Sequence, residues 1–161
     1  MNKAIFLDRD GVINIELGDY VLDEKNFLLV ENLAQNLKLL KEHNYLLIVI
    51  SNQGGIAKKL FTKEHVESLH QKIQEELKKS GVEIDEFYFC PHYPGISNCI
   101  CRKPDTLMLE KAIARFNIDP SQSYFIGDRE TDYMAGNKVG LNSIKVNSNQ
   151  NLTGIIDQLI N

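Results

Sequence analysis

The chain has 161 residues, a length that favours one domain with a single core, over residues 1–161. Its 22 acidic and 18 basic side chains give a net charge of −4, and 25% of the residues are charged. This composition is ordinary for a soluble protein, and it argues against a disordered chain or a dedicated nucleic-acid binder, which normally carries a basic excess.

Short apolar runs, typical of buried strands, alternate along the chain with longer segments of helical spacing. In chain order they predict a strand at Lys3 to Leu7, a helix at Val30 to Leu40, a strand at Tyr45 to Ile50, a helix from Thr62 to near Gly81, a strand at Phe87 to Phe89, a helix at Met108 to Phe116, a strand at Tyr124 to Ile126, a helix at Met134 to Val139, a strand at Ser143 to Val146 and a helix at Leu152 to Ile160. This alternation implies a parallel sheet covered on both faces, and in such sheets ligands bind outside the carboxyl ends of the strands.

Acidic residues follow two of the predicted strands. Asp8 and Asp10 come directly after the first strand, on a turn that Gly11 allows to bend sharply. A lone Asp-x-Asp is most often a solvated turn, because Asp is common in turns. Asp128 and Asp132 follow the fourth strand, however, and the carboxyl ends of parallel strands share one edge of a sheet. We therefore expect these carboxylates to lie near one another.

Groups suited to bind an anion follow other strands. Ser51 and Asn52 end the second strand with a hydroxyl, an amide and exposed backbone N–H groups. Arg102 and Lys103 place two cations just before a helix, and Arg129 follows Asp128. The Ser51-Asn52 segment alone would be interpreted as a turn, but together these residues favour an anion site at the same edge of the sheet.

The polar strand ends resemble the four signature motifs of the haloacid dehalogenase (HAD) superfamily of phosphotransferases, over essentially the whole chain. The matching segments are Asp8-Arg9-Asp10-Gly11, Ser51-Asn52, Lys103-Pro104, and Gly127-Asp128 with Asp132. The resemblance implies a Rossmann-like, three-layer α/β/α fold with a central, mainly parallel five-stranded sheet. Residues 11–30 and 53–85 together hold only a loop and one helix, so we expect no cap domain and an open site.

The resemblance also implies roles for these residues. Asp8 would be the nucleophile that forms an aspartyl-phosphate, and Asp10 the acid and base. Mg²⁺ would lie between the Asp8 carboxylate, the Asp10 backbone carbonyl and Asp128, while Ser51 and Lys103 would bind the phosphoryl oxygens. The chemistry agrees, because a carboxylate that attacks a phosphate dianion needs cations to offset the repulsion.

Asp132 would either bind the metal directly or accept hydrogen bonds from outside the metal's coordination sphere, and we favour the second role. Asn52, Arg102 and Arg129 would contact the substrate.

The three cysteines lie within one short segment, residues 90–101. Cys90, His92, Cys99 and Cys101 form a Cys₃His set that suits zinc, whereas an odd number of cysteines in a reducing compartment disfavours disulfides. One residue separates the ligands of each pair, which is closer than in common zinc knuckles. Four protein ligands close the coordination sphere, so we expect a structural zinc that fixes where Arg102 and Lys103 enter the site.

This Cys-x-His and Cys-x-Cys-Arg-Lys-Pro arrangement resembles the HAD branch that contains the heptose bisphosphate and histidinol-phosphate phosphatases. Four segments resemble the heptose enzymes: Asp19-Tyr20-Val21, Asn52-Gln53, Gly55-Ile56-Ala57 and Phe61-Thr62. Arg129, however, stands where those enzymes often have Lys. Only six residues separate His92 from Cys99, a spacing nearer that of the histidinol-phosphate enzymes. We favour hydrolysis of D-glycero-D-manno-heptose 1,7-bisphosphate to the 1-phosphate, with histidinol phosphate as the alternative substrate.

Two interpretations without turnover compete with that of an enzyme. A phospho-acceptor receiver module also has strand-end aspartates and a lysine, but the zinc cluster and a second acid, Asp10, favour turnover. A zinc-dependent nucleic-acid module is disfavoured by the net charge of −4.

We expect a small phosphorylated metabolite as the partner, a monomer, and neither nucleic acid nor a membrane. The run Ala4 to Leu7 is cut by Asp8-Arg9-Asp10, so the N-terminus does not resemble a signal peptide and we expect a cytoplasmic protein.

Overall fold

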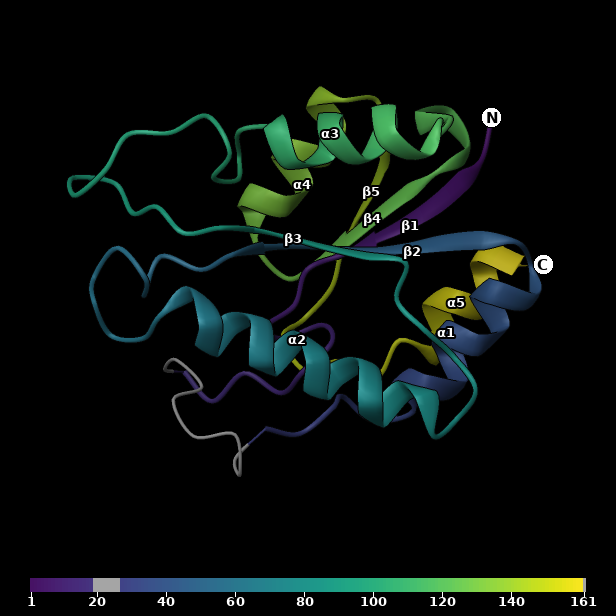
Figure 1. Cartoon of the computed structure of the whole chain (residues 1–161). Helices are drawn as coiled ribbons and strands as arrows, with labels where there is room; N and C mark the ends of the chain where they lie inside the picture. The colour runs from purple at the N-terminus through teal and green to yellow at the C-terminus, as the bar shows by residue number, and fades with distance from the viewer. Residues whose placement is uncertain (19–26, 161) are drawn as a thin grey trace.

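A computed structural model describes residues 1–18 and 27–160, and a twisted five-stranded sheet lies at its centre (Figure 1). The elements in chain order are β1 (Lys3–Leu7), α1 (Leu33–Glu42), β2 (Tyr45–Asn52), α2 (Lys63–Lys78), β3 (Glu86–Cys90), α3 (Leu107–Phe116), the 3₁₀ helix Pro120–Gln122, β4 (Tyr124–Gly127), α4 (Glu130–Lys138), β5 (Asn142–Lys145) and α5 (Thr153–Ile160). The segment Asp19-Tyr20-Val21 lies outside the described residues.

All neighbouring strands of the sheet are parallel, in the order β3-β2-β1-β4-β5. Helices α3 and α4 cover one face, and α1, α2 and α5 cover the other (Figure 1). The predicted three-layer α/β/α fold is thus confirmed. The central strand β1 is apolar from Ala4 to Leu7 without a break, because a parallel strand covered on both faces has no solvent side.

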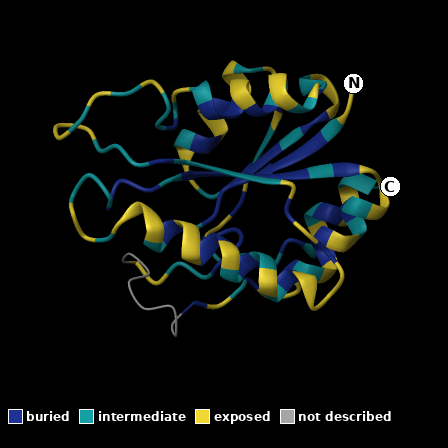
Figure 2. Ribbon diagram, in the orientation of Figure 1, coloured by how far each residue is buried: buried dark blue, intermediate teal, exposed yellow. Residues whose placement is uncertain are grey.

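Two hydrophobic cores lie on the two faces of the sheet. Alternate residues of β1 divide between them, with Ile5 and Leu7 in the core under α1 and α2, and Ala4 and Phe6 in the core under α3. These four side chains are fully buried, and each large one contributes about 1.5–3 kcal/mol of hydrophobic stabilisation. The buried strands appear in Figure 2 as a dark band between partly exposed helices.

The ten predicted strands and helices are all present, with small differences at their ends. Thr62 caps α2, since its Oγ1 accepts a hydrogen bond from His65 N at 3.3 Å. Helix α4 begins at Glu130, one turn before the predicted Met134. It begins there because Asp132 Oδ2 accepts from Arg129 N at 3.0 Å and so caps the helix.

No cap domain interrupts the described residues, as predicted. Between β1 and β2 the only described helix is α1, and between β2 and β3 it is α2. Instead, the loops at residues 53–62 and 91–106 extend past the carboxyl ends of the strands (Figure 1). No helix in the described part of the chain has both the length and the apolar character needed to span a membrane.

Candidate active site

The carboxyl ends of the strands border a cavity of about 990 Å³. Its lining brings together Asp8 and Asp10 after β1, Asn52 at the end of β2, Lys103 before α3 and Asp132 on α4. These residues come from all four predicted motifs. The cavity therefore lies at the edge of the sheet where the sequence predicts it.

Lys103 lies at the centre of this cluster. Its Nζ donates to Asp8 Oδ1 at 2.8 Å and to the backbone oxygen of Ile50 at 2.8 Å, and it lies 2.6 Å from Asp132 Oδ1. Burial alone would lower the pKa of Lys103, but its attraction to Asp8 and Asp132 outweighs burial and raises that pKa. The ammonium group is therefore charged in the site.

Asp8 is buried, with only 5% of its surface exposed. Burial raises the pKa of Asp8 to about 7, with a further contribution from Asp132, while Lys103 opposes the rise. Its Oδ1 accepts from both Lys103 Nζ and Arg9 N, each at 2.8 Å. The predicted nucleophile is thus fixed in position, and additional positive charge is needed to keep it fully ionised at neutral pH.

Three carboxylates form a group that fits a hard cation. Asp8, Asp128 and Asp132 each offer an oxygen, and these oxygens lie within 4.8 Å of one another. Asp128 Oδ1 is buried and has no hydrogen-bond partner among the described residues, and burial raises the pKa of Asp128. Oxygen donors with an unsatisfied acceptor suit Mg²⁺. Asp132, expected outside the coordination sphere, lies in the same group.

The raised pKa of Asp8 predicts that Mg²⁺ binding depends on pH. Below pH 7 the free carboxyl holds a proton that a metal must displace, so the apparent affinity should fall about tenfold per pH unit, given the pKa of about 7. Calorimetric titration with Mg²⁺ between pH 5.5 and 8 measures this slope. Asp8→Asn, which carries no such proton, serves as the control, and a wild-type affinity independent of pH would contradict the prediction.

The Asp10 carboxylate is surrounded by donors that sequence reasoning missed. Its Oδ1 accepts from Arg9 Nη2 at 2.9 Å and from Asn14 Nδ2 at 3.1 Å, and its Oδ2 accepts from Gln53 Nε2 at 2.8 Å. Burial would raise the pKa of Asp10, but attraction to Arg9 and these hydrogen bonds outweigh it and lower that pKa. Arg9, Asn14 and Gln53 therefore stabilise the ionised form of Asp10.

Two predicted phosphate-binding residues follow one another at the end of β2. Asn52 Oδ1 accepts from Lys103 N at 3.0 Å, and its Nδ2 donates to Lys103 O at 3.1 Å. The Asn52 amide thus holds the backbone on both sides of Lys103. Ser51 is fully buried, and its Oγ accepts from Gln53 Nε2 at 2.7 Å.

The two predicted substrate-binding arginines line the same cavity. Arg102 Nη1 donates to the His92 backbone oxygen at 3.0 Å, and its guanidinium carbon lies 5.2 Å from the centre of the Tyr93 ring. Arg129 Nη2 pairs with Glu16 Oε1 at 2.8 Å. Both cations are therefore held by neighbouring groups while they face the cavity.

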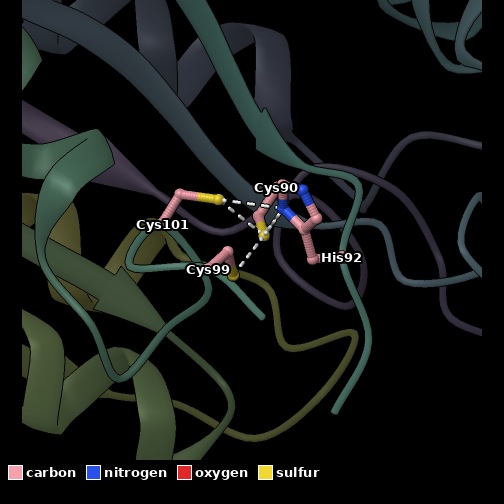
Figure 3. A group of neighbouring side chains, drawn as sticks. All are labelled: Cys90, His92, Cys99 and Cys101. Carbon is pink, nitrogen blue, oxygen red and sulfur yellow. Dashed lines mark hydrogen bonds between the residues drawn. The ribbon is translucent and has the colours of Figure 1, made fainter. Parts of the chain in front are cut away.

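The four predicted zinc ligands converge at the end of β3, which holds Cys90, and in the loop that follows it (Figure 3). Cys90 Sγ lies 3.5 Å from His92 Nδ1 and 3.7 Å from Cys99 Sγ, and Cys101 Sγ lies 3.4 Å from His92 Nδ1. Cys101 Sγ is closer to Cys90 Sγ, at 2.9 Å. Zinc bonds to sulfur of about 2.3 Å in a tetrahedron place two sulfurs roughly 3.8 Å apart, so most of this arrangement fits zinc.

Comparisons with known proteins identify the family of the chain. A family model described as "HAD-hyrolase-like" matches residues 100–157. The D-glycero-beta-D-manno-heptose-1,7-bisphosphate 7-phosphatase of Haemophilus ducreyi is 40% identical over 145 residues, which cover 86% of this chain and 79% of that protein. The protein of the same name from Helicobacter pylori is 43% identical over 136 residues, covering 84% and 78%.

A solved structure shows the same fold. The D,D-heptose 1,7-bisphosphate phosphatase from B. bronchiseptica, complexed with magnesium and phosphate, matches with a TM-score of 0.83 at 24% identity, over 98% of this chain and 97% of that chain. Together with relatives at 40% identity or more, this likeness confirms the predicted HAD-like phosphatase fold. The chain therefore belongs to the heptose bisphosphate phosphatase family of the haloacid dehalogenase superfamily.

Proposed function

We propose that this protein is a Mg²⁺-dependent phosphatase that converts D-glycero-D-manno-heptose 1,7-bisphosphate to the 1-phosphate. The names of its relatives support the substrate. One observation carries the chemistry: the buried Asp8 carboxylate accepts from Lys103 Nζ at 2.8 Å, beside the unpartnered oxygen of Asp128. A nucleophile, a fixed cation and a metal-binding group thus meet at one point of the cavity.

The reaction would proceed in two displacements. A carboxylate oxygen of Asp8 attacks phosphorus, the bond from phosphorus to the sugar oxygen breaks, and that oxygen takes a proton from Asp10. A water molecule, deprotonated by Asp10, then attacks the aspartyl-phosphate, which releases phosphate and restores Asp8. Lys103 Nζ and the Ser51 hydroxyl bind the phosphoryl oxygens in both steps.

The protonation of Asp10 fits this sequence of steps. Its donors favour the ionised form, which is the base of the second step. A phosphate dianion brought beside Asp10 raises its pKa again, because like charges disfavour ionisation. Magnesium, held by Asp8, Asp128 and the Asp10 backbone carbonyl, would offset negative charge on the phosphoryl oxygens.

Zinc would act as a structural clamp on residues 90–101. The convergence of one nitrogen and three sulfurs supports this role, and four protein ligands would leave no position for a reacting water. Cys101 directly precedes Arg102 and Lys103, so the clamp would fix both cations. We also propose a cytoplasmic location, because a reducing compartment keeps the three thiols available to zinc.

Arg102 is our candidate for binding the part of the substrate that a simple ester lacks. Its planar guanidinium lines the cavity and suits a second phosphate or sugar hydroxyls. We expect Arg102→Ala to lower kcat/KM for the heptose bisphosphate by about ten- to thousandfold, and that for 4-nitrophenyl phosphate far less. Steady-state kinetics on both esters measure the difference.

The control for this variant is Arg115→Ala, which removes an exposed arginine on α3 outside the cavity. Equal losses on the two esters would mean that Arg102 serves the chemical step and does not recognise the distal part of the substrate.

A panel of phosphate esters tests the substrate itself. The purified protein is assayed with Mg²⁺ on the heptose bisphosphate, other sugar bisphosphates, histidinol phosphate and 4-nitrophenyl phosphate. The highest kcat/KM should belong to the heptose bisphosphate. A strong preference for histidinol phosphate would instead support the alternative suggested by the six residues between His92 and Cys99.

A further inference from the structure

We propose that Gln53 is a positioning residue whose single amide group orients two parts of the active site, the Ser51 hydroxyl and the Asp10 carboxylate. Gln53 follows β2 and is 2% exposed. Its Nε2 lies 2.7 Å from Ser51 Oγ and 2.8 Å from Asp10 Oδ2. The inference rests on the roles proposed above for Ser51 and Asp10.

The geometry fixes which end of the amide faces these groups. A carboxylate only accepts hydrogen bonds, so the nitrogen end of Gln53 must face Asp10. Its two hydrogens are then both used, one by Asp10 and one by Ser51. The Gln53 backbone is also held, because its N–H donates to Cys90 O at 2.8 Å and its oxygen accepts from Ile56 N at 3.2 Å.

For Ser51 the consequence is a defined direction of the hydroxyl hydrogen. Ser51 Oγ is the acceptor in its bond to Gln53, and a hydroxyl has one hydrogen to donate. That hydrogen is therefore free for a phosphoryl oxygen. Without the Gln53 amide, the Ser51 hydroxyl loses this donor, and the direction of its hydrogen is no longer fixed.

For Asp10 the consequence is a fixed carboxylate plane. Gln53 Nε2 donates to Oδ2 at 2.8 Å and Arg9 Nη2 does so at 3.1 Å, while Arg9 and Asn14 also donate to Oδ1. Since one NH₂ group binds both Asp10 and Ser51, the proton donor and the phosphate-binding hydroxyl keep a constant separation. Gln74 is a glutamine with a structural role, because its Nε2 donates to Ile84 O and its Oε1 accepts from Ile84 N, both at 2.8 Å.

The test uses two aryl esters that differ in their need for a proton. Phenolate is a poorer leaving group than 4-nitrophenolate, so phenyl phosphate depends more on Asp10, and kcat/KM reports formation of the phosphoenzyme. We expect Gln53→Met to lower kcat/KM about tenfold for 4-nitrophenyl phosphate and about a hundredfold for phenyl phosphate. When Ser51→Ala is already present, adding Gln53→Met should lower kcat/KM for 4-nitrophenyl phosphate by less than about twofold further.

Gln74→Met is the matched control and should leave the ratio of the two esters unchanged. Gln53→Glu keeps the shape of the side chain but replaces the donor with an acceptor, so it should lower kcat/KM for phenyl phosphate at least as much as Gln53→Met does. It serves as the test variant if Gln53→Met fails to fold. Equal losses on both esters, or full additivity with Ser51→Ala, would overturn the proposal. Because both esters are generic, the result is independent of whether the heptose bisphosphate is the substrate.

Discussion

Asp8→Asn is expected to abolish Mg²⁺-dependent phosphate release, with residual turnover below about a thousandth of wild type. Asparagine has nearly the same shape, and its Oδ1 can still accept from Lys103 Nζ and Arg9 N, as the aspartate oxygen does at 2.8 Å. It lacks the anionic oxygen that would attack phosphorus. The measurement is release of inorganic phosphate from 4-nitrophenyl phosphate and from the heptose bisphosphate.

The fold of this variant should be intact, as checked by circular dichroism and thermal unfolding. Asp157→Asn makes the same chemical change at an exposed position of α5, outside the cavity lining, and should keep full activity. If Asp8→Asn retained more than about a thousandth of wild-type turnover, covalent catalysis by Asp8 would be ruled out.

The strands were the most predictable part of the fold. A parallel strand buried on both faces needs a continuous apolar run. The strand predicted at Lys3 to Leu7 therefore has the same first and last residues as β1 in the structure. The start of α4 was less predictable. Asp132 resembles a catalytic acid in the sequence, and its second task, accepting from Arg129 N, appears only in the folded chain.

The strand-end rule located the site but not its supporting groups. Gln53 meets Asp10 across 43 positions of the sequence, and Asn14 reaches Asp10 because the turn after β1 folds back, with Asn14 N donating to Arg9 O at 3.1 Å. Similarly, the Asn52 amide bonds to the backbone of Lys103, 51 positions away. Such contacts depend on side-chain directions in three dimensions, which spacing in one chain does not encode.

Loss of zinc is expected to have the largest effect on the stability of the active-site loop. The purified protein should contain one zinc per chain, because the three sulfurs and the His92 nitrogen lie within 4.8 Å of one another. Apparent zinc-binding free energies in small zinc domains are about 10–16 kcal/mol, so the free energy of unfolding should fall by several kcal/mol on removal. The apolar part of the fold should remain, since both cores lie largely within the sheet and its helices.

Removal of zinc should lower the phosphatase activity, although zinc takes no part in the reaction. Lys103 lies two positions after Cys101, so the clamp would hold its backbone from one side, while the Asn52 side chain of β2 holds it from the other. We expect a strong chelator, followed by excess Mg²⁺, to lower turnover and to increase hydrogen exchange in residues 91–103. Added zinc should restore both. Ser97→Ala, which changes the same loop without removing a ligand, should keep its zinc, whereas metal analysis that finds no zinc and three reactive thiols would disprove the clamp.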